Sequence, residues 1–224
     1  MNIVNYQKEM EKILIQIKEG LIVGEEVPSL FLHSCCAPCS SYVLKYLMEY
    51  FRITVFYYNP NITEQEEYKK RVEEQKKLIK IYNEKLESKD FLNGYHIDIV
   101  EGDYVPDKFF DMTKDYKDCT EGGKRCFLCY EMRLLETAQR ALDNDFNYFA
   151  TTLTISPLKN AAKINEIGYN LEKQLGISWL PSDFKKKDGY KQSVILSGEY
   201  GLYRQDYCGC VYSKAESSQR LARI

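Results

Sequence analysis

The chain has 224 residues, of which 44% are hydrophobic and 29% are charged, and its formal net charge is −2. This length and composition suit one domain, or one domain with an appendage, that buries a core of ordinary size. The charge balance excludes a global basic field for nucleic acid, although a local basic face is compatible with it. No secretory signal opens the chain and no apolar run approaches the ~20 residues of a membrane span, so we expect a cytoplasmic protein with no membrane partner.

The predicted elements alternate between strand and helix along most of the chain. The apolar spacing predicts helices over residues 1–20, 41–51, 63–86, 126–144 and 160–176, and strands over residues 29–34, 52–59, 95–100 and 148–154. Thr63 and Glu66 form a capping-box pattern at the start of the third helix, and Gly176 is a typical residue to end the last one. Residues from 177 to 213 lack this alternation and predict an α-rich cap that ends in a thiol-bearing loop.

This order of elements predicts an α/β fold, in which a Rossmann-like parallel sheet is covered by helices on both faces. We expect three parts: a helical extension over residues 1–28, the α/β domain with its cap over 29–213, and a tail over 214–224. Sites in such sheets form at the carboxyl ends of the strands, where the "HSCCAPCSS" and "TISPLKN" segments lie. The first segment resembles an S-G-G-x-D-S nucleotide loop in which both glycines are cysteines, so metal ligands replace the phosphate cradle.

Eight cysteines are the main chemical clue, because structural disulfides are disfavoured in the cytoplasm and such thiols are first considered as metal ligands or redox groups. Cys126 and Cys129 form a C-x-x-C pair at a helix start, a pattern shared by zinc sites, iron–sulfur clusters and redox dithiols. The adjacent Cys35 and Cys36 suit a cluster of several irons better than a tetrahedral zinc ion. If the two turns meet in space, these four cysteines supply the thiolates of a [4Fe–4S] cluster.

The other four cysteines have less certain roles. Cys39 is a spare ligand, a ligand of a second metal, or simply buried, and Cys119 has no assigned role. Cys208 and Cys210 form a C-x-C pair, too tight for an unstrained disulfide, so a bond between them would be easily reduced. This pair therefore predicts a labile dithiol that delivers electrons, with two further metal ligands as the alternative.

Four blocks of sequence together resemble the epoxyqueuosine reductase QueH family: "HSCCAPCS", "RCFLCYEMRL", "TTLTISPLKN" and "YRQDYCGCVYS". The likeness covers roughly residues 29 to 213. It implies an oxidoreductase of queuosine biosynthesis, which reduces the epoxide of epoxyqueuosine at the wobble position of tRNA to the alkene of queuosine. It also implies a [4Fe–4S] cluster on Cys35, Cys36, Cys126 and Cys129, a redox-active pair at Cys208 and Cys210, and a second, mononuclear iron. Some members carry aspartate at the position of Cys39, which supports Cys39 as a ligand of that iron.

The implied partners are tRNA carrying epoxyqueuosine in its anticodon loop and an electron donor whose identity the sequence does not give. A loop base is recognised by aromatic stacking and polar contacts, and the predicted substrate contacts are Tyr130, Arg133, Lys159, Asn160 and Tyr207. The basic runs at 69–71 and 185–187 are either solvated faces or phosphate contacts.

Three other functions compete with this interpretation. A zinc-stabilised RNA-binding module without catalysis explains the cysteines as structural ligands. An ATP-dependent tRNA-modifying enzyme needs the nucleotide loop that the cysteines replace. A dithiol oxidoreductase built on Cys208 and Cys210 alone leaves the vicinal Cys35 and Cys36 unexplained.

Overall fold

The protein is described by a computed structural model that covers residues 4–88 and 93–221. In chain order its elements are α1 (Tyr6–Ile22), β1 (Ser29–His33), α2 (Ala37–Leu47), β2 (Arg52–Tyr57), α3 (Gln65–Glu87), β3 (Ile97–Glu101), α4 (Pro106–Thr113), the 3₁₀ turn η1 (Lys114–Tyr116), α5 (Lys124–Asp143), β4 (Tyr148–Thr151), the 3₁₀ turn η2 (Thr152–Ile155), α6 (Ala161–Leu175), β5 (Ser178–Trp179), α7 (Gly189–Glu199) and α8 (Val211–Leu221).

The five strands form one parallel sheet in the order β3-β2-β1-β4-β5. Leu32 in the central strand pairs with Val55 on one side and with Ala150 on the other. The order reverses between β1 and β4, and this is where ligand sites form in Rossmann-like sheets. The predicted α/β fold with a parallel sheet is thus confirmed.

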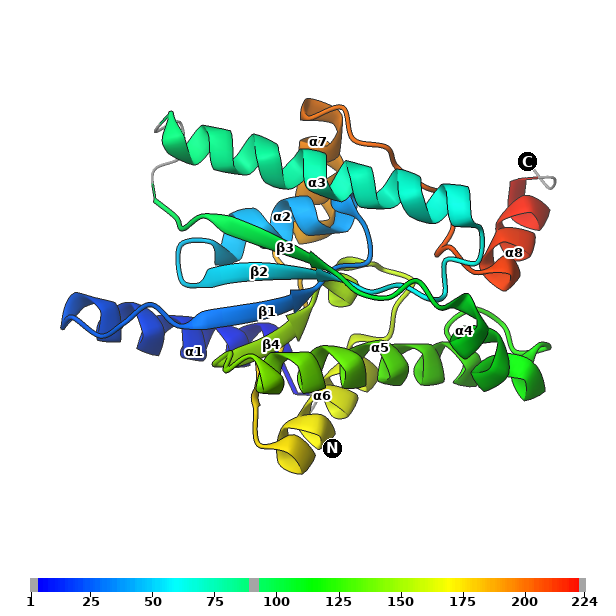
Figure 1. Cartoon of the computed structure of the whole chain (residues 1–224), viewed down its shortest axis with the longest axis horizontal. Helices are drawn as coiled ribbons and strands as arrows, with labels where there is room; N and C mark the ends of the chain where they lie inside the picture. The colour runs from blue at the N-terminus through cyan, green and yellow to red at the C-terminus, as the bar shows by residue number, and fades with distance from the viewer. Residues whose placement is uncertain (1–3, 89–92, 222–224) are drawn as a thin grey trace.

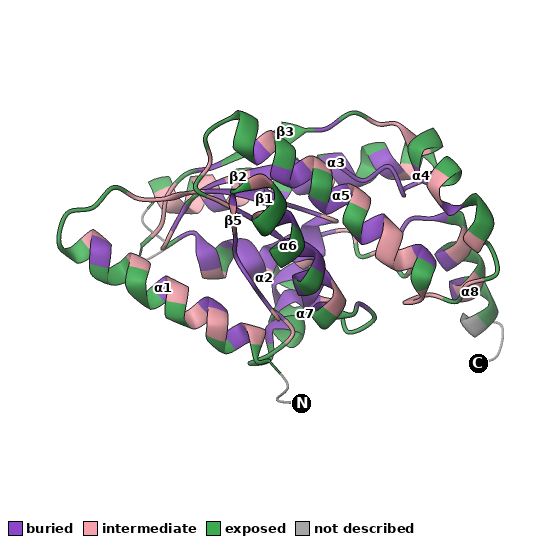
Figure 2. Cartoon of the chain, turned by 90° about the horizontal axis from the view of Figure 1, so that it is seen from below, coloured by how far each residue is buried: buried purple, intermediate pink, exposed green. Residues whose placement is uncertain are grey.

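Helices cover both faces of the sheet, and the alternation of side chains along each strand decides which face a residue meets (Figure 1). Leu30 and Leu32 pack with residues of α1, α2 and α3 in one core cluster. Phe31, which lies between them, packs with residues of α5 and α6 in the other cluster. Figure 2 shows the result: the inner strands β1, β2 and β4 are largely buried, and the covering helices have a buried inner stripe and an exposed outer one. In the edge strand β3 only Ile97 is buried.

The helices at the two ends of the chain are both tied to the α/β core. Met10 and Leu14 of α1 are buried in the cluster that contains the central strand. Helix α8 crosses residue 213, and Glu216 on it pairs with Arg125 of α5. The division into parts at residues 28 and 213 stays a prediction. None of the described helices is long and apolar enough to cross a membrane.

Several predicted details differ from the structure. The capping box is wrong, because α3 has Glu64 at its N-cap without a side-chain cap bond, and Thr63 lies one residue earlier. The helix predicted from residue 41 begins at Ala37, since Pro38 in the first turn needs no hydrogen-bond partner for its nitrogen. The predicted α-rich cap also contains β5, which pairs with β4. The Gly176 helix end is confirmed, with a left-handed φ of 82°.

Candidate functional site

The site lies at the carboxyl ends of β1 and β4, the two neighbouring strands where the sheet order reverses. The strands point toward the end of the sheet near α8 and α4 (Figure 1). The chain leaves β1 through residues 34–36 into α2, and leaves β4 through η2 and the loop that leads to α6. Both predicted segments therefore meet at one edge of the sheet.

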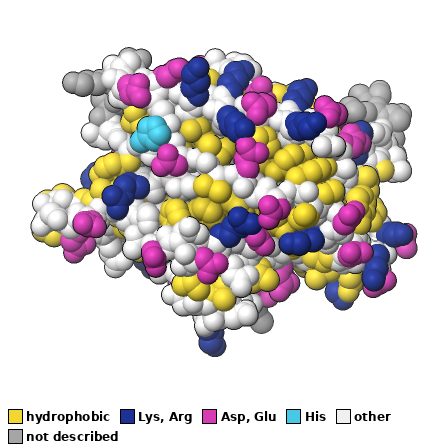
Figure 3. Space-filling model, in the orientation of Figure 1, with side chains coloured by type: hydrophobic (Ala, Val, Ile, Leu, Met, Phe, Trp, Pro, Cys, Tyr) yellow, Lys and Arg dark blue, Asp and Glu magenta, His cyan; other side chains and the backbone are white. Residues whose placement is uncertain are grey.

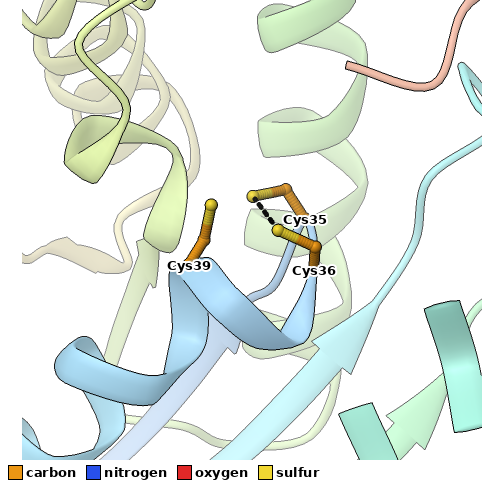
Figure 4. Close-up of side chains that lie close together, drawn as sticks. All are labelled: Cys35, Cys36 and Cys39. Carbon is orange, nitrogen blue, oxygen red and sulfur yellow. Dashed lines mark hydrogen bonds between the residues drawn. The ribbon is translucent and has the colours of Figure 1, made fainter. Parts of the chain in front are cut away.

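Three thiols converge at the turn after β1 (Figure 4). The sulfur atoms of Cys35, Cys36 and Cys39 all lie within 4.8 Å of one another, and the first two are 3.8 Å apart. Cys36 is the N-cap of α2, and Cys39 lies in the first turn of that helix. The short strand and the immediate helix start thus bring together side chains that would diverge on an extended chain.

A buried polar network supports this turn from below. The hydroxyl groups of Ser34 and Ser40 both donate to Oε1 of Gln75 on α3, at 2.7 and 3.0 Å. Ser40 also donates to the backbone oxygen of Cys36, and the amide of Asn59 donates to the backbone oxygen of Ser34 at 2.8 Å. The main chain on both sides of Cys35 is therefore held by side chains that water does not reach.

His33, at the end of β1, is fully buried and hydrogen-bonded. Its ring nitrogens lie 2.8 Å from Oγ1 of Thr151 and 3.1 Å from the backbone oxygen of Tyr58. Burial lowers the pKa of His33 to about 3, so the ring is neutral at physiological pH. Its two contacts link the end of β1 to the last residue of β4 and to the residue that follows β2.

The pKa values of the three clustered thiols are shifted in different directions. Hydrogen bonds from the Cys36 and Cys39 thiols, helped by the charge of Lys159 and by Thr152, hold the pKa of Cys35 well below its usual value. The same hydrogen bond to Cys35 raises the pKa of Cys36 to about 12, and contact with both neighbours raises the pKa of Cys39. The cluster thus favours a single thiolate at Cys35 when no cation is bound.

Two further thiols come from the start of α5. Cys126 and Cys129 are three residues apart and so lie on one face of the helix. The backbone nitrogen of Gly122 donates to the sulfur of Cys126 at 3.3 Å. Burial raises the pKa of Cys129 to about 12, although nearby Arg133 opposes this rise. These thiols need a cation to remain ionised at neutral pH.

The last two thiols belong to a loop that docks on the start of α3. The guanidinium of Arg71 donates to the backbone oxygens of Cys208 and Tyr207 at 3.2 and 3.4 Å. The Asn61 amide also donates to the Cys208 oxygen, at 3.4 Å. Gly209 has a φ of 115°, and a Cβ there would lie 2.7 Å from Cγ1 of Ile62. The loop conformation therefore requires this glycine.

Lys159 links the two groups of thiols. Its side chain is 9% exposed, and Nζ donates to the sulfur of Cys208 at 3.3 Å. Burial alone would lower its pKa, but the electrostatic interaction with Cys208, Tyr130 and Cys35 outweighs burial and raises the pKa of Lys159 well above its usual value. A buried ammonium group thus stands between the thiols of β1 and those of the C-terminal loop.

Two adjoining cavities are lined by these thiols. The larger, of about 360 Å³, is large enough for a small organic group and is lined by Cys35, Cys36, Pro38, Cys39, Arg71, Glu121, Ser156, Pro157, Leu158, Lys159, Tyr190, Ser193, Arg204, Gln205, Asp206, Tyr207 and Cys208. The smaller, of about 20 Å³, is lined by Asn61, Phe109, Glu121, Arg125, Cys126, Cys129, Tyr130, Arg133, Lys159, Cys208, Cys210 and Ser213. Lys159, Cys208 and Glu121 line both cavities.

The structure brings the predicted metal ligands together in two sets. Cys35, Cys36 and Cys39 form one set, and Cys126 and Cys129 share the small cavity with the C-terminal pair. All eight cysteines are free thiols. Among the described residues, Cys119 lines neither cavity, and its backbone oxygen accepts a hydrogen bond from Arg125.

The predicted substrate contacts occupy different environments. Tyr207 is half-buried and lines the larger cavity, whereas Tyr130 and Arg133 are buried beside the small one. Arg133 donates to the backbone oxygen of Cys129 at 3.2 Å and to Oδ1 of Asn59 at 3.3 Å. Asn160 caps α6, where its side chain accepts from the backbone nitrogen of Lys163, and it lines neither cavity in the described part of the chain.

Arg71 and Thr152 were missed by the sequence analysis. Arg71 belongs to the basic run 69–71, yet its side chain is 2% exposed and pairs with Glu67 at 2.7 Å. Its place in the buried stripe of α3, at helical spacing from Tyr68 and Gln75, was the available signal. Thr152 contacts both the nitrogen and the sulfur of Cys35, but a threonine in a strand-like run carries no such signal.

The surface of the protein mixes charges of both signs. On the face shown in Figure 3, lysine and arginine side chains alternate with aspartate and glutamate along α3 and over the sheet edge. Several of these charges pair along α3, such as Lys69 with Glu66 and Lys76 with Glu73. This face therefore carries no broad basic field, in agreement with the net charge of −2.

Comparison with known proteins identifies the family. The model of the family described as "Epoxyqueuosine reductase QueH" matches residues 30–216. The chain belongs to the QueH family. The epoxyqueuosine reductase QueH of Staphylococcus epidermidis is 41% identical over 213 residues, which cover 94% of this chain and 84% of that protein. The QueH protein of Thermotoga maritima is 36% identical over 199 residues, which cover 88% of this chain and 95% of that one.

Structural comparison adds little to this QueH assignment. A solved structure of NMN synthetase from Francisella tularensis covers 99% of this chain and 94% of its own, with a TM-score of 0.39 and 11% identity. That likeness is too small to support any inference about this QueH protein.

Proposed function

We propose that this QueH protein is an epoxyqueuosine reductase that acts on tRNA. The observation that carries the proposal is the gathering of seven thiols and a buried lysine around two adjoining cavities at the switch point of the sheet. The relatives bear the name epoxyqueuosine reductase and match nearly the whole chain. A tRNA substrate implies activity in the cytoplasm.

The thiols fit an iron–sulfur cofactor in their chemistry. Cys35, Cys36, Cys126 and Cys129 would hold a [4Fe–4S] cluster, which takes four thiolate ligands. Burial raises the pKa of Cys126 and Cys129, so bound iron would supply the positive charge that ionises them. When bound, such a cluster transfers electrons one at a time at low potential.

Cys39 would be a ligand of a second metal, the mononuclear iron. The sulfur of Cys39 lies within 4.8 Å of the sulfurs of Cys35 and Cys36, so a metal ion held by Cys39 would lie beside the cluster ligands. Cys39 is the third thiol of that group. A metal ion there would act as a Lewis acid toward an oxygen in the larger cavity.

The reaction needs two electrons and two protons. An epoxide that gains them loses its oxygen as water and leaves an alkene, and a dithiol that gives them up becomes a disulfide. Cys208 and Cys210 would supply this pair, because they lie beside the other thiols and line the same small cavity. Lys159 would hold a proton at Nζ next to Cys208. Together the two half-reactions balance.

The modified base would enter through the larger cavity. A loop base must leave its stack to be read by aromatic and polar side chains. Tyr207 and Tyr190 line that cavity together with Arg204 and Lys159. These residues offer ring faces for the base and positive charge for a phosphate of the loop.

The decisive experiment combines metal analysis with turnover. After anaerobic purification, iron, sulfide and zinc are measured, and tRNA carrying epoxyqueuosine is incubated with the protein and a low-potential reductant. We expect about four irons with sulfide, extra iron for the second site, and queuosine as the product. Cys126→Ser should lose the cluster and activity, whereas the matched variant Cys119→Ser should keep both.

A zinc-stabilised RNA-binding module is the second candidate, because the Cys35–Cys36–Cys39 triad also suits one tetrahedral ion. It predicts a colourless protein with about one zinc ion and no queuosine formation after reconstitution with iron and sulfide. That result would remove the reductase from consideration.

A further inference from the structure

We infer that the two thiols of the C-terminal loop have different tasks: Cys208 exchanges with an external dithiol reductant, and Cys210 is the resolving thiol. This inference rests on the proposed function, in which the pair supplies electrons to the reaction. It specifies the chemical class of the electron donor and the sulfur atom that the donor meets.

The two thiols differ first in access. Cys208 lines both cavities, including the larger one, whose rim carries the exposed Arg204 and Asp206. Cys210 is 8% exposed, lines only the cavity of about 20 Å³, and packs against Phe109 and Cys129. A cavity of that size holds about one water molecule, so a reductant can reach Cys208 but not Cys210.

They differ next in their partners. The ammonium group of Lys159 donates to the sulfur of Cys208 at 3.3 Å. The sulfur of Cys210 lies 3.4 Å from both the hydroxyl and the backbone nitrogen of Ser213, in the first turn of α8. Cys208 thus faces a buried ammonium group at the cavity wall, whereas Cys210 contacts the first turn of a helix.

Hydrogen bonds hold the loop backbone so that Cys208 and Cys210 cannot exchange their positions. Arg71 and Asn61 hold the backbone oxygen of Cys208, and the backbone nitrogen of Thr63 donates to the oxygen of Gly209 at 3.2 Å. The hydroxyl of Ser213 accepts from the backbone nitrogen of Cys208 at 3.1 Å. Because these bonds fix the backbone on both sides of the pair, the difference in access is built into the fold.

The exchange chemistry balances without any further reactant. A dithiol donor attacks the sulfur of Cys208 in the Cys208–Cys210 disulfide, forms a mixed disulfide with it and releases Cys210 as a thiolate, which takes up a proton. The second thiol of the donor then attacks the donor's first sulfur, which is bonded to Cys208 in the mixed disulfide, and so releases Cys208 as a thiolate that takes up a proton. The donor leaves as a disulfide, and the protein has gained two electrons and two protons.

Thiol labelling of single variants tests this assignment. Cys208→Ser and Cys210→Ser are each treated with an aromatic disulfide reagent, and the mixed disulfide is quantified in the tryptic peptide of residues 205–214, which then holds one cysteine. We expect Cys208 to react ~10-fold faster than Cys210, because access governs the rate of exchange. Cys119, in a separate tryptic peptide, calibrates the reagent dose in each digest. Equal rates, or faster labelling of Cys210, would overturn the inference.

Turnover separates this inference from the proposed function. With dithiothreitol as the only reductant, the wild-type protein should form queuosine, whereas both serine variants should lose most of this activity. If both variants match the wild type, the pair does not supply electrons and the proposed role of the dithiol fails. Thermal unfolding of the two variants checks that the loss is not a folding defect.

Discussion

The two thiol-bearing segments of the site are built in opposite ways. The turn with Cys35, Cys36 and Cys39 continues the central strand into a helix, so the regular backbone itself positions the sulfur atoms. The loop with Cys208 and Cys210 has no such frame, and side chains from residues 61–71 hold its backbone oxygens. The first segment follows the geometry of its strand and helix and has polar side chains beneath it. The second depends on contacts between residues more than a hundred positions apart.

Helix α3 contacts both thiol-bearing segments. Gln75 lies under the first segment and Arg71 under the second, one helical turn apart on the buried stripe of the helix. A single helix face therefore contacts both groups of thiols and sets their relative position. Substitutions on that face should therefore act selectively on one segment or the other.

The largest effect is expected for Arg71→Met. The substitution removes the donor to two buried carbonyl groups and leaves Glu67, which is 12% exposed, without its cation. Breaking a buried pair costs about 3–5 kcal/mol, so urea unfolding should show a loss of that order and dithiothreitol-driven turnover should fall. Arg140→Met is the matched control: its pairs lie at the surface and contribute less than about 1 kcal/mol. A similar small loss for both variants would contradict the anchoring role of Arg71.

Gly209→Ala should destabilise the docking of the same loop, because it adds a side chain where the backbone lies close to Ile62. The new Cβ would lie 2.7 Å from Ile62, and such overpacking costs about 1–3 kcal/mol. Gly201→Ala is the control, because Gly201 also has a positive φ but has open space around it. The difference between the two unfolding free energies measures the contact with Ile62. Equal values would mean that the loop can move away.

Gln75→Leu should disturb the other segment. It removes the acceptor shared by Ser34 and Ser40 under the Cys35 turn, at a cost of about 1–2 kcal/mol. We expect a lower iron content after anaerobic reconstitution, while labelling of Cys208 stays at the wild-type rate. The exposed Gln139→Leu on α5 should change neither quantity. A change confined to Cys208 labelling would reverse the assignment of the two segments.

The smallest effect is expected for Asn160→Ala, in the loop after β4. Loss of the N-cap of α6 costs about 1 kcal/mol. Asn5→Ala removes the equivalent cap of α1 and should give a similar loss. If Asn160 acts only as a cap, KM for the tRNA stays the same in both variants. A rise in KM for Asn160→Ala alone would instead support the predicted contact with substrate.

The periodic parts of the fold could be predicted from the sequence. The alternation of strands such as residues 52–57 with long amphipathic helices such as α3 is a local signal, and it led to the parallel sheet. Two-residue β5 could not be recognised, because Ser178 and Trp179 form a strand only by pairing with β4. The capping box failed because Glu64, not Thr63, takes the cap position.

The site could be predicted as a set of residue types but not as an arrangement. The cysteines could be recognised from the sequence, because their chemistry is distinctive and their spacings are typical of metal ligands and redox pairs. It could not foresee that Arg71 is buried, since a run of three basic residues is indistinguishable by composition from a solvated surface. It also assigned Asn160 to the substrate; the structure shows that this side chain caps α6, and its contact with substrate stays a prediction.

The docking of the C-terminal loop on residues 61–71 also sets an order of events while the protein is being made. Roughly 170 residues separate the first thiols from the last pair, and a ribosome that adds ~5–20 residues per second needs about 9–35 s to cover them. For most of that interval, from residue 71 onward, the platform of Asn61 and Arg71 has already been synthesised and its partner has not. The nascent chain therefore carries the older cysteines for many seconds before the segment that closes over them exists.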